Sequence, residues 1–172
     1  MMLPAEIEAL DSSAEEVEAE EVVTGACFID TNVLVYAASS GAPLHKRASE
    51  ELRRRAESGQ ELWVSRQVLR EYLAAMSRPQ TFAKPRPARE LVSDIRYFLS
   101  HFRLVEEGHA VTEKLLELIE EVEVGGKQIH DANLVATMLA GEIPTLLTHN
   151  VGDFVRFREL IKVIPLDDGD QL

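Results

Sequence analysis

The chain has 172 residues, of which 18 are Lys or Arg and 30 are Asp or Glu, so its formal net charge is −12. This length suits one domain with a sizeable core, and the acidity argues against a protein that coats nucleic acid, because phosphate binding needs clustered positive charge. A single cysteine, Cys27, excludes an internal disulfide framework and a cysteine zinc site. The sequence has no apolar run long enough to span a membrane and no basic-then-apolar leader, so we expect a cytoplasmic protein.

The negative charge is concentrated at the start of the chain. Residues 1–24 contain eight acidic residues and no Lys or Arg, whereas residues 25–172 contain 22 acids and 18 bases. We therefore divide the chain into an acidic leader, 1–24, expected to be flexible, and a nearly balanced domain, 25–172. Three interpretations of the leader stay open: a solvated tail, an arm that competes with phosphates for a basic groove, and an extension upstream of a native start near Val22 or Val23.

Short apolar runs alternate with amphipathic segments through the domain. The run 27–29, with the apolar segment 33–37 after it, predicts a buried strand followed by a turn. Ser65 is the expected N-cap of a helix in which apolar residues recur with the 3.6-residue period. The expected helices are 45–58, 66–77, 88–101, 111–122 and 129–140. The expected later strands are 62–64, 103–105, 145–148 and 162–166.

Strands separated by helices predict an α/β domain with a central parallel sheet and helices on both faces. Ligands in such folds lie beyond the carboxyl ends of the strands. Asp30 directly follows the first predicted strand, where a charged group is costly to bury unless it is paired or binds a cation. Asp153 lies in the loop segment after the strand 145–148. Turn formation, or a cap in the case of Asp30, is the alternative explanation of both positions.

Two further acids lie on predicted helices. Asp131 begins a row with Leu134, Val135 and Met138 on one helix face, so its carboxylate is expected on the core side. The alternative explanation is an Asp near the helix start that is stabilised by the helix dipole. Glu71 lies at the rim of an apolar helix face, a position that is usually solvated. Carboxylates gathered at one sheet edge repel one another, and a divalent cation removes that repulsion. Oxygen ligands without Cys favour Mg²⁺ or Mn²⁺ over zinc.

Four segments, in this order, resemble the motifs of PIN-domain ribonucleases, specifically the VapC-type toxins of toxin–antitoxin pairs. The segments are 28–34, 70–73, 130–136 and 147–154. Any one of them is a weak signal, but the four in order are specific. The resemblance covers about residues 26–166, and it implies a PIN-like three-layer α/β/α fold with a central parallel sheet of about five strands.

The resemblance also implies a site. The catalytic and metal-binding acids would be Asp30, Glu71, Asp131 and Asp153. The supporting side chains would be Thr31, Asn32, Thr148 and Asn150. Family members can carry an acid at the position of Asn150, so the neutral amide leaves open whether Asn150 or Asp153 completes the site, and whether one or two metal ions bind.

The implied activity is that of a metal-dependent endoribonuclease, the toxin of a type II toxin–antitoxin system. Mg²⁺, or Mn²⁺, would lower the pKa of a bound water that attacks the RNA backbone. The implied partners are RNA, a cognate antitoxin protein and a second copy of the chain in a homodimer, with no membrane. The candidate RNA-binding cations are Lys46, Arg47, Arg53, Arg54, Arg55, Arg86, Arg89, Arg156 and Arg158.

Other enzyme classes fit these residues less well. A dehalogenase-type phosphatase needs a second Asp two residues after the first, where this chain has Asn32. A P-loop enzyme needs a glycine-rich phosphate motif that the sequence lacks, and a response receiver needs an adjacent acidic pair at the first strand. The alternative that stays open is a catalytically weakened PIN-fold module that binds RNA or a protein partner.

Overall fold

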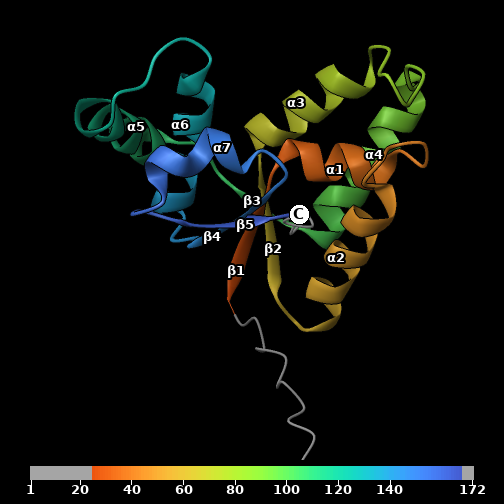
Figure 1. The fold of residues 1–172 in the computed structure, drawn as a ribbon, viewed down its shortest axis with the longest axis horizontal. Coiled ribbons are helices and arrows are strands. Elements are labelled where there is room, and N and C mark those ends of the chain that lie inside the picture. Colours follow the sequence, from red (N-terminus) through yellow and green to blue (C-terminus); the bar gives the residue numbers. More distant parts are fainter. Residues whose placement is uncertain (1–24, 168–172) are drawn as a thin grey trace, which may run out of the picture.

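In the computed structural model, which describes residues 25–167, five strands form one parallel sheet in the order β3-β2-β1-β4-β5 (Figure 1). The strands are β1 (Ala26–Ile29), β2 (Glu61–Ser65), β3 (Arg103–Val105), β4 (Thr145–Thr148) and β5 (Lys162–Pro165). The sheet confirms the predicted fold class. The predicted acidic leader lies outside the described residues.

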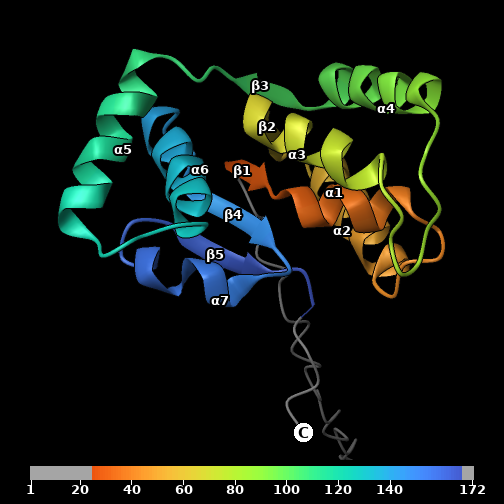
Figure 2. The same cartoon turned by 90° about the horizontal axis from the view of Figure 1, so that it is seen from above.

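Helices cover both faces of the sheet, as predicted (Figure 2). One face carries α1 (Thr31–Ala38), α2 (His45–Glu57), α3 (Arg66–Met76) and α4 (Ala88–His101). The other carries α5 (His109–Glu121), α6 (Gln128–Ala140), α7 (Val151–Phe154) and the 3-10 helix η1 (Val155–Phe157). Within residues 25–167, no helix combines the length and the apolar character needed to cross a bilayer.

The connections between strands change face at one place in the sheet. The links from β1 to β2 and from β2 to β3 use α1 to α4, whereas the return to β4 and β5 uses α5 to α7. The change therefore falls between the neighbouring strands β1 and β4. Such a switch point opens a crevice at the carboxyl ends of the strands, where α/β folds bind their ligands.

Two predictions about local structure were wrong. Residues 33–37 do not form a turn but belong to α1, because Asp30 caps a helix there by accepting a hydrogen bond from the Thr31 backbone N–H. A short apolar run does not separate a strand from a buried helix by period alone. Asp153 lies not in a loop but in the short helix α7, whose four residues leave little periodic signal. The other elements begin and end within two residues of the prediction.

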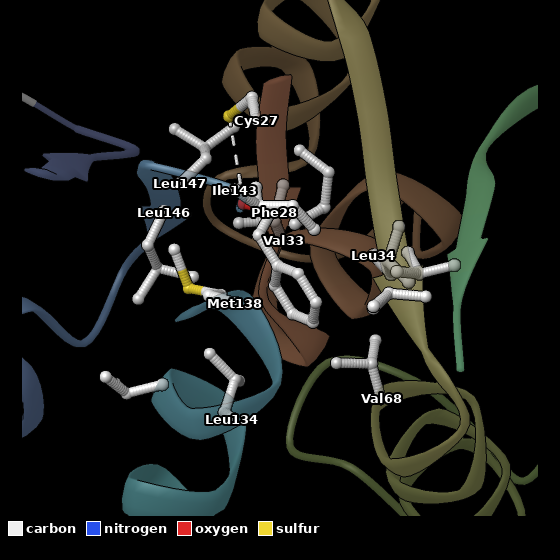
Figure 3. Packing of buried hydrophobic residues seen from close by; sticks show 14 of the residues in the cluster. Cys27, Phe28, Val33, Leu34, Val68, Leu134, Met138, Ile143, Leu146 and Leu147 are labelled. Atoms are coloured by element: carbon white, nitrogen blue, oxygen red, sulfur yellow. Dashed lines mark hydrogen bonds between the residues drawn. The ribbon is translucent and has the colours of Figure 1, made fainter. Parts of the chain in front are cut away.

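The core is built on both faces of β1 and its neighbours. Phe28 and Leu146 are partners in the β1–β4 register, and both are fully buried. Phe28 and Met138 of α6 belong to the same buried cluster (Figure 3). On the opposite layer, α1 packs against α3, and the two helices contribute Leu34 and Val68 to the same cluster (Figure 3). This dense packing holds the ends of β1 and β4, and with them the side chains that follow, in fixed positions.

A buried polar cluster lies at the amino end of the sheet. Arg55 of α2 is only 2% exposed and forms an ion pair with Glu51 at 2.7 Å. Its guanidinium also donates to Gln60 Oε1 at 2.8 Å and to Cys27 Sγ at 3.8 Å. Burial raises the pKa of Cys27 to about 11, which keeps it as an inert thiol.

Candidate active site

Asp30 lies where β1 ends and α1 begins, and it is 7% exposed. Its Oδ1 accepts from the Thr31 backbone N–H at 2.6 Å, and its Oδ2 accepts from Asn32 Nδ2 at 2.7 Å and from Thr148 Oγ1 at 2.6 Å. Burial raises the pKa of Asp30 to about 6, against the opposing effect of these hydrogen bonds. The donors occupy three of the roughly four lone-pair sites of a carboxylate, so Asp30 is fixed and keeps room for one further ligand.

Thr148 and Asn32 join the two strands at the switch point. Thr148 ends β4, is fully buried, and accepts from Asn32 Nδ2 at 3.1 Å and from the Asn150 backbone N–H at 3.0 Å. Asn32 in turn accepts a hydrogen bond from the His149 backbone N–H at 3.0 Å. These contacts tie the start of α1 to the chain that leaves β4, so the surroundings of Asp30 are set from both sides of the switch point.

Glu71, half-buried on α3, is also held at both oxygens. Thr31 Oγ1 donates to Oε2 at 2.8 Å, and Gln67 Nε2 donates to Oε1 at 2.8 Å. Gln67, which is 7% exposed, donates as well to the His130 carbonyl at 3.0 Å and accepts from Asn133 Nδ2 at 2.7 Å. The buried amide therefore connects Glu71 to α6.

Asp131 and Asp153 come from the other face of the sheet. Asp131 is half-buried in the first turn of α6, and Asp153 is exposed on α7. Burial raises the pKa of Asp131, and the negative charges of Asp153 and Glu71 raise it further, against a weaker opposing effect of the His130 and Arg156 charges. The repulsion shows that these three carboxylates share one electrostatic environment.

One cavity of about 340 Å³ brings the predicted acids together at the carboxyl ends of the strands. Its lining consists of Asp30, Thr31, Asn32, Val35, Tyr36, Glu71, Ala75, Gln80, Phe82, Asp131, Asn150, Asp153 and Phe154. All four predicted acids line it, as do three of the four predicted supporting residues. The fourth, Thr148, is buried behind Asp30. No Lys, Arg or His side chain is among the described residues that line the cavity, so its charge is wholly negative.

The residue types in the cavity fit a hard cation, whereas their spacing does not form a closed site. Among residues 25–167, no three His, Cys, Asp or Glu side chains lie close enough to share one metal ion. The donors are carboxylate, amide and hydroxyl oxygens, which suit Mg²⁺ or Mn²⁺. Asp30 and Glu71 retain acceptor capacity beyond their hydrogen bonds, and the repulsion at Asp131 is the kind that a cation relieves.

Several cationic side chains predicted as RNA contacts form ion pairs or hydrogen bonds within the protein. Arg55 is removed from the candidates, because it is buried in its ion pair with Glu51. Arg86 pairs with Asp94 at 2.9 Å, and Arg156 donates to the Glu123 carbonyl at 3.0 Å and to a neighbouring side chain. The remaining candidates are exposed on helices or, in the case of Arg158, in the turn after η1, and all of them lie outside the cavity lining.

Sequence reasoning missed the uncharged residues that organise the site. Gln67 lies one helical turn before Glu71, and Asn133 lies within the motif segment 130–136, so a polar residue at a helix-face position was the available signal. Tyr36, Gln80 and Phe82 were also missed as cavity residues. Only the packing of α1 against the α3–α4 loop brings them to the acids.

The family model of the PIN domain matches residues 27–160. A chain of VapBC2 from Rickettsia felis, solved with a DNA fragment from the promoter, is 21% identical with a TM-score of 0.63, over 83% of this chain and 99% of that one. A chain of VapBC-1 from nontypeable Haemophilus influenzae is 16% identical with a TM-score of 0.58, over 82% of this chain and 98% of that one. VapC20 of Mycobacterium tuberculosis, described as a sarcin-ricin loop cleaving toxin, is 17% identical with a TM-score of 0.54, over 70% of this chain and 86% of that one.

No curated protein matches the chain in sequence. At identities this low, the solved structures establish a shared fold and leave activity to be argued from the site. The family match spans more than half of the chain and includes all four motif segments in full. The resemblance read from those segments is thereby confirmed, and the chain belongs to the PIN domain family.

Proposed function

We propose that this protein is a metal-dependent endoribonuclease and the toxin of a type II toxin–antitoxin pair. The observation that carries the proposal is the cavity, in which four carboxylates and no positive side chain of the described residues lie at the switch point of a PIN-family sheet. The description of VapC20 as a sarcin-ricin loop cleaving toxin supports RNA as the substrate class.

The acids have separate tasks in the proposed reaction. Asp30, Glu71, Asp131 and Asp153 would hold Mg²⁺ or Mn²⁺, which when bound offsets the charge of a phosphodiester and makes a water more acidic. Asp30 and Glu71 are oriented by the hydrogen bonds of Thr31, and Asp30 also by Thr148. Fixed donors of this kind remove the need to reorganise the site during reaction.

A proton leaves the attacking water, and Asp131 is the group that we assign to accept it. Asp131 is half-buried in the first turn of α6 and lines the same cavity as Asp30 and Glu71, where the water would be bound. The reaction needs no covalent enzyme intermediate, because the water itself attacks the phosphorus.

An antitoxin partner and a homodimer belong to the same proposal. The R. felis and H. influenzae structures are of VapBC complexes, which supports a protein partner for this chain. A basic side chain of such a partner would be attracted into the acidic cavity, because no positive charge of the described lining competes with it. Occupying the cavity in this way would inhibit the enzyme.

One observation favours a second candidate, a catalytically weakened module that binds RNA or a protein. Asn150 provides a neutral amide in the cavity, and the described acids do not form a closed three-ligand site. A weakened module would bind RNA or its partner through the same cavity without cleaving RNA.

Incubation of the purified full chain with a defined single-stranded RNA, in Mg²⁺, in Mn²⁺ and in EDTA, separates the two. We expect cleavage in both metals and none in EDTA. The cleavage rate of Asp30→Asn should fall by about 100-fold or more, which is the usual effect of removing a group that acts in the transition state. Glu120→Gln, which removes an exposed acid of α5 that is not part of the cavity lining, serves as the matched control and should cleave normally. Cleavage that persists in EDTA and in Asp30→Asn would contradict the proposal, and binding without cleavage would favour the weakened module.

A further inference from the structure

A row of three rings lies beside the acids. Tyr36 is in the last turn of α1, Phe82 is on the α3–α4 loop, and His149 directly follows β4. The ring centroids of Tyr36 and Phe82 are 5.9 Å apart at an interplanar angle of 54°, and those of Tyr36 and His149 are 5.4 Å apart in an edge-to-face arrangement. Tyr36 and Phe82 line the same cavity as the four carboxylates.

The loop that carries Phe82 is held in place by its own contacts. The Gln80 backbone N–H donates to the Ala83 carbonyl at 2.8 Å, and Gln80 Nε2 donates to the Ala75 carbonyl at 2.6 Å, which ties the turn to the end of α3. Gly41 packs so closely on this loop that a Cβ at its position would lie 2.6 Å from the Phe82 carbonyl oxygen. The backbone of the loop is therefore pressed onto the segment after α1, and Phe82 is held against Tyr36.

These two rings are not part of the buried core. Both are half-buried, although aromatic side chains of this size gain most when they are fully covered. They pack against the edge of the core, whose own rings, such as Phe28, are completely buried. The lining of one cavity thus combines carboxylates, among them Asp30 and Asp131, with the two rings of Tyr36 and Phe82.

A nucleotide of single-stranded RNA has the same two parts, a phosphate and a flat aromatic base. Proteins bind exposed bases by stacking them on aromatic side chains, whereas the bases of a duplex are covered by their neighbours. We propose that Tyr36 and Phe82 form a nucleobase-stacking subsite, which takes one base of a single-stranded RNA while the adjoining phosphate lies at the carboxylates of the same cavity. The inference rests on the proposed function and adds to it the form of the RNA and the residues that grip its base.

Base stacking can be measured without cleavage. An eight-nucleotide single-stranded RNA that contains 2-aminopurine, titrated with the full chain in Ca²⁺ buffer, reports stacking as a loss of probe fluorescence. Phe82→Leu and Tyr36→Leu keep an apolar side chain but lose the ring face. We expect each to weaken RNA binding by about tenfold, within the range found for the loss of one stacked base, and to lose most of the quenching. Tyr97→Leu removes an exposed tyrosine of α4 outside the cavity and should bind as the wild type does.

Cleavage of the unlabelled RNA in Mg²⁺, measured on the same proteins, distinguishes this inference from the proposed function. A wild type that cleaves, with a dissociation constant and quenching unchanged in Phe82→Leu and Tyr36→Leu, overturns the stacking subsite and keeps the nuclease. A wild type that does not cleave, yet quenches the probe through Phe82 and Tyr36, rejects the nuclease and keeps the subsite. A wild type that neither binds nor quenches overturns the subsite.

Discussion

Asp30 combines a structural role with the chemical role that we propose for it. Its side chain caps α1, and the same carboxylate accepts hydrogen bonds from Asn32 and from Thr148 across the switch point. A buried carboxylate is tolerated when it is hydrogen-bonded, but burial still disfavours its charged form. Asp30 is therefore fixed by three hydrogen bonds, and its pKa is nevertheless raised above the ordinary value.

The titration of Asp30 is predicted from this environment. In EDTA its pKa is expected at about 6, above its ordinary value of 3.8. Because the folded-state pKa is raised, the folded protein binds the proton more tightly than the unfolded chain does. The contribution of Asp30 to stability is then fully present below about pH 4 and is lost as the pH rises through about 6.

Carbon-detected NMR of the side-chain carboxyl groups in EDTA measures this pKa directly. Added Mg²⁺ should lower it, because a bound cation favours the charged carboxylate. Glu51 is the internal comparison, since hydrogen bonds from Arg54 and the charge of Arg55 outweigh its burial and hold its pKa below the ordinary value. A titration midpoint for Asp30 near 4 in EDTA would show that its burial is not effective in solution.

At the scale of elements, the site depends on how α3 and α6 are joined. Ser65 ends β2 and caps α3, with its side chain accepting from the Val68 backbone N–H, so the start of the helix that carries Glu71 is fixed by the sheet. The buried amide of Gln67 then links this helix to the His130 carbonyl and to Asn133 of α6. The neutral side chain of Gln67 thus fixes Glu71 relative to α6, the helix that carries Asp131.

Replacement of Gln67 tests this link. Gln67→Leu leaves the Asn133 amide and the His130 carbonyl without their partner, and we expect the free energy of unfolding to fall by about 1–3 kcal/mol. RNA cleavage should fall as well, because Glu71 loses one of its two orienting hydrogen bonds. Gln67→Glu keeps the acceptor for Asn133 but brings a second carboxylate beside Glu71. Urea unfolding and cleavage rates measure both effects, and a Gln67→Leu variant with wild-type stability and rate would contradict the role.

At the scale of the whole molecule, the two ends of the sheet have different tasks. The carboxyl ends hold the acidic cavity, whereas the amino end holds the buried pair of Arg55 and Glu51 with Gln60 and Cys27. The pair contributes no side chain to the cavity. Changes at the amino end should therefore alter stability without altering the chemistry of the folded protein.

The buried pair gives a double-mutant test of this separation. Glu51→Leu leaves Arg55 buried without its counter-charge, and we expect a loss of about 3–5 kcal/mol in the free energy of unfolding. The double variant Glu51→Leu with Arg55→Met removes both charges, and it should recover much of that loss because apolar side chains can replace a buried ion pair. Urea unfolding measures the cycle. A double variant as unstable as Glu51→Leu would show that the other contacts of the cluster, rather than the charge of Arg55, decide its stability.

The sequence by itself determined the order and type of nearly all elements and the four acids. Apolar runs and 3.6-residue periods follow directly from which residues avoid water, so β4 and α4 have the predicted bounds. Asp30 could be singled out because a charged residue directly after a buried strand is costly unless it is paired, whereas the set of four acids came from the resemblance of the four motif segments. The segment 33–37 failed, because its run of apolar residues is compatible with either a strand or a buried helix and only the Asp30 cap decides between them.

Only the tertiary structure decided which side chains meet. The polar helix positions of Gln67 and Asn133 gave only a weak signal and Tyr36 and Phe82 gave none, because their contacts with each other join segments that are distant along the chain. The same holds for the candidate cations, since the burial of Arg55 depends on Glu51, Gln60 and Cys27 gathering around it. Residue types and periods are properties of the chain, whereas pairing, burial and the electrostatics of the cavity arise when β1 and β4 become neighbours.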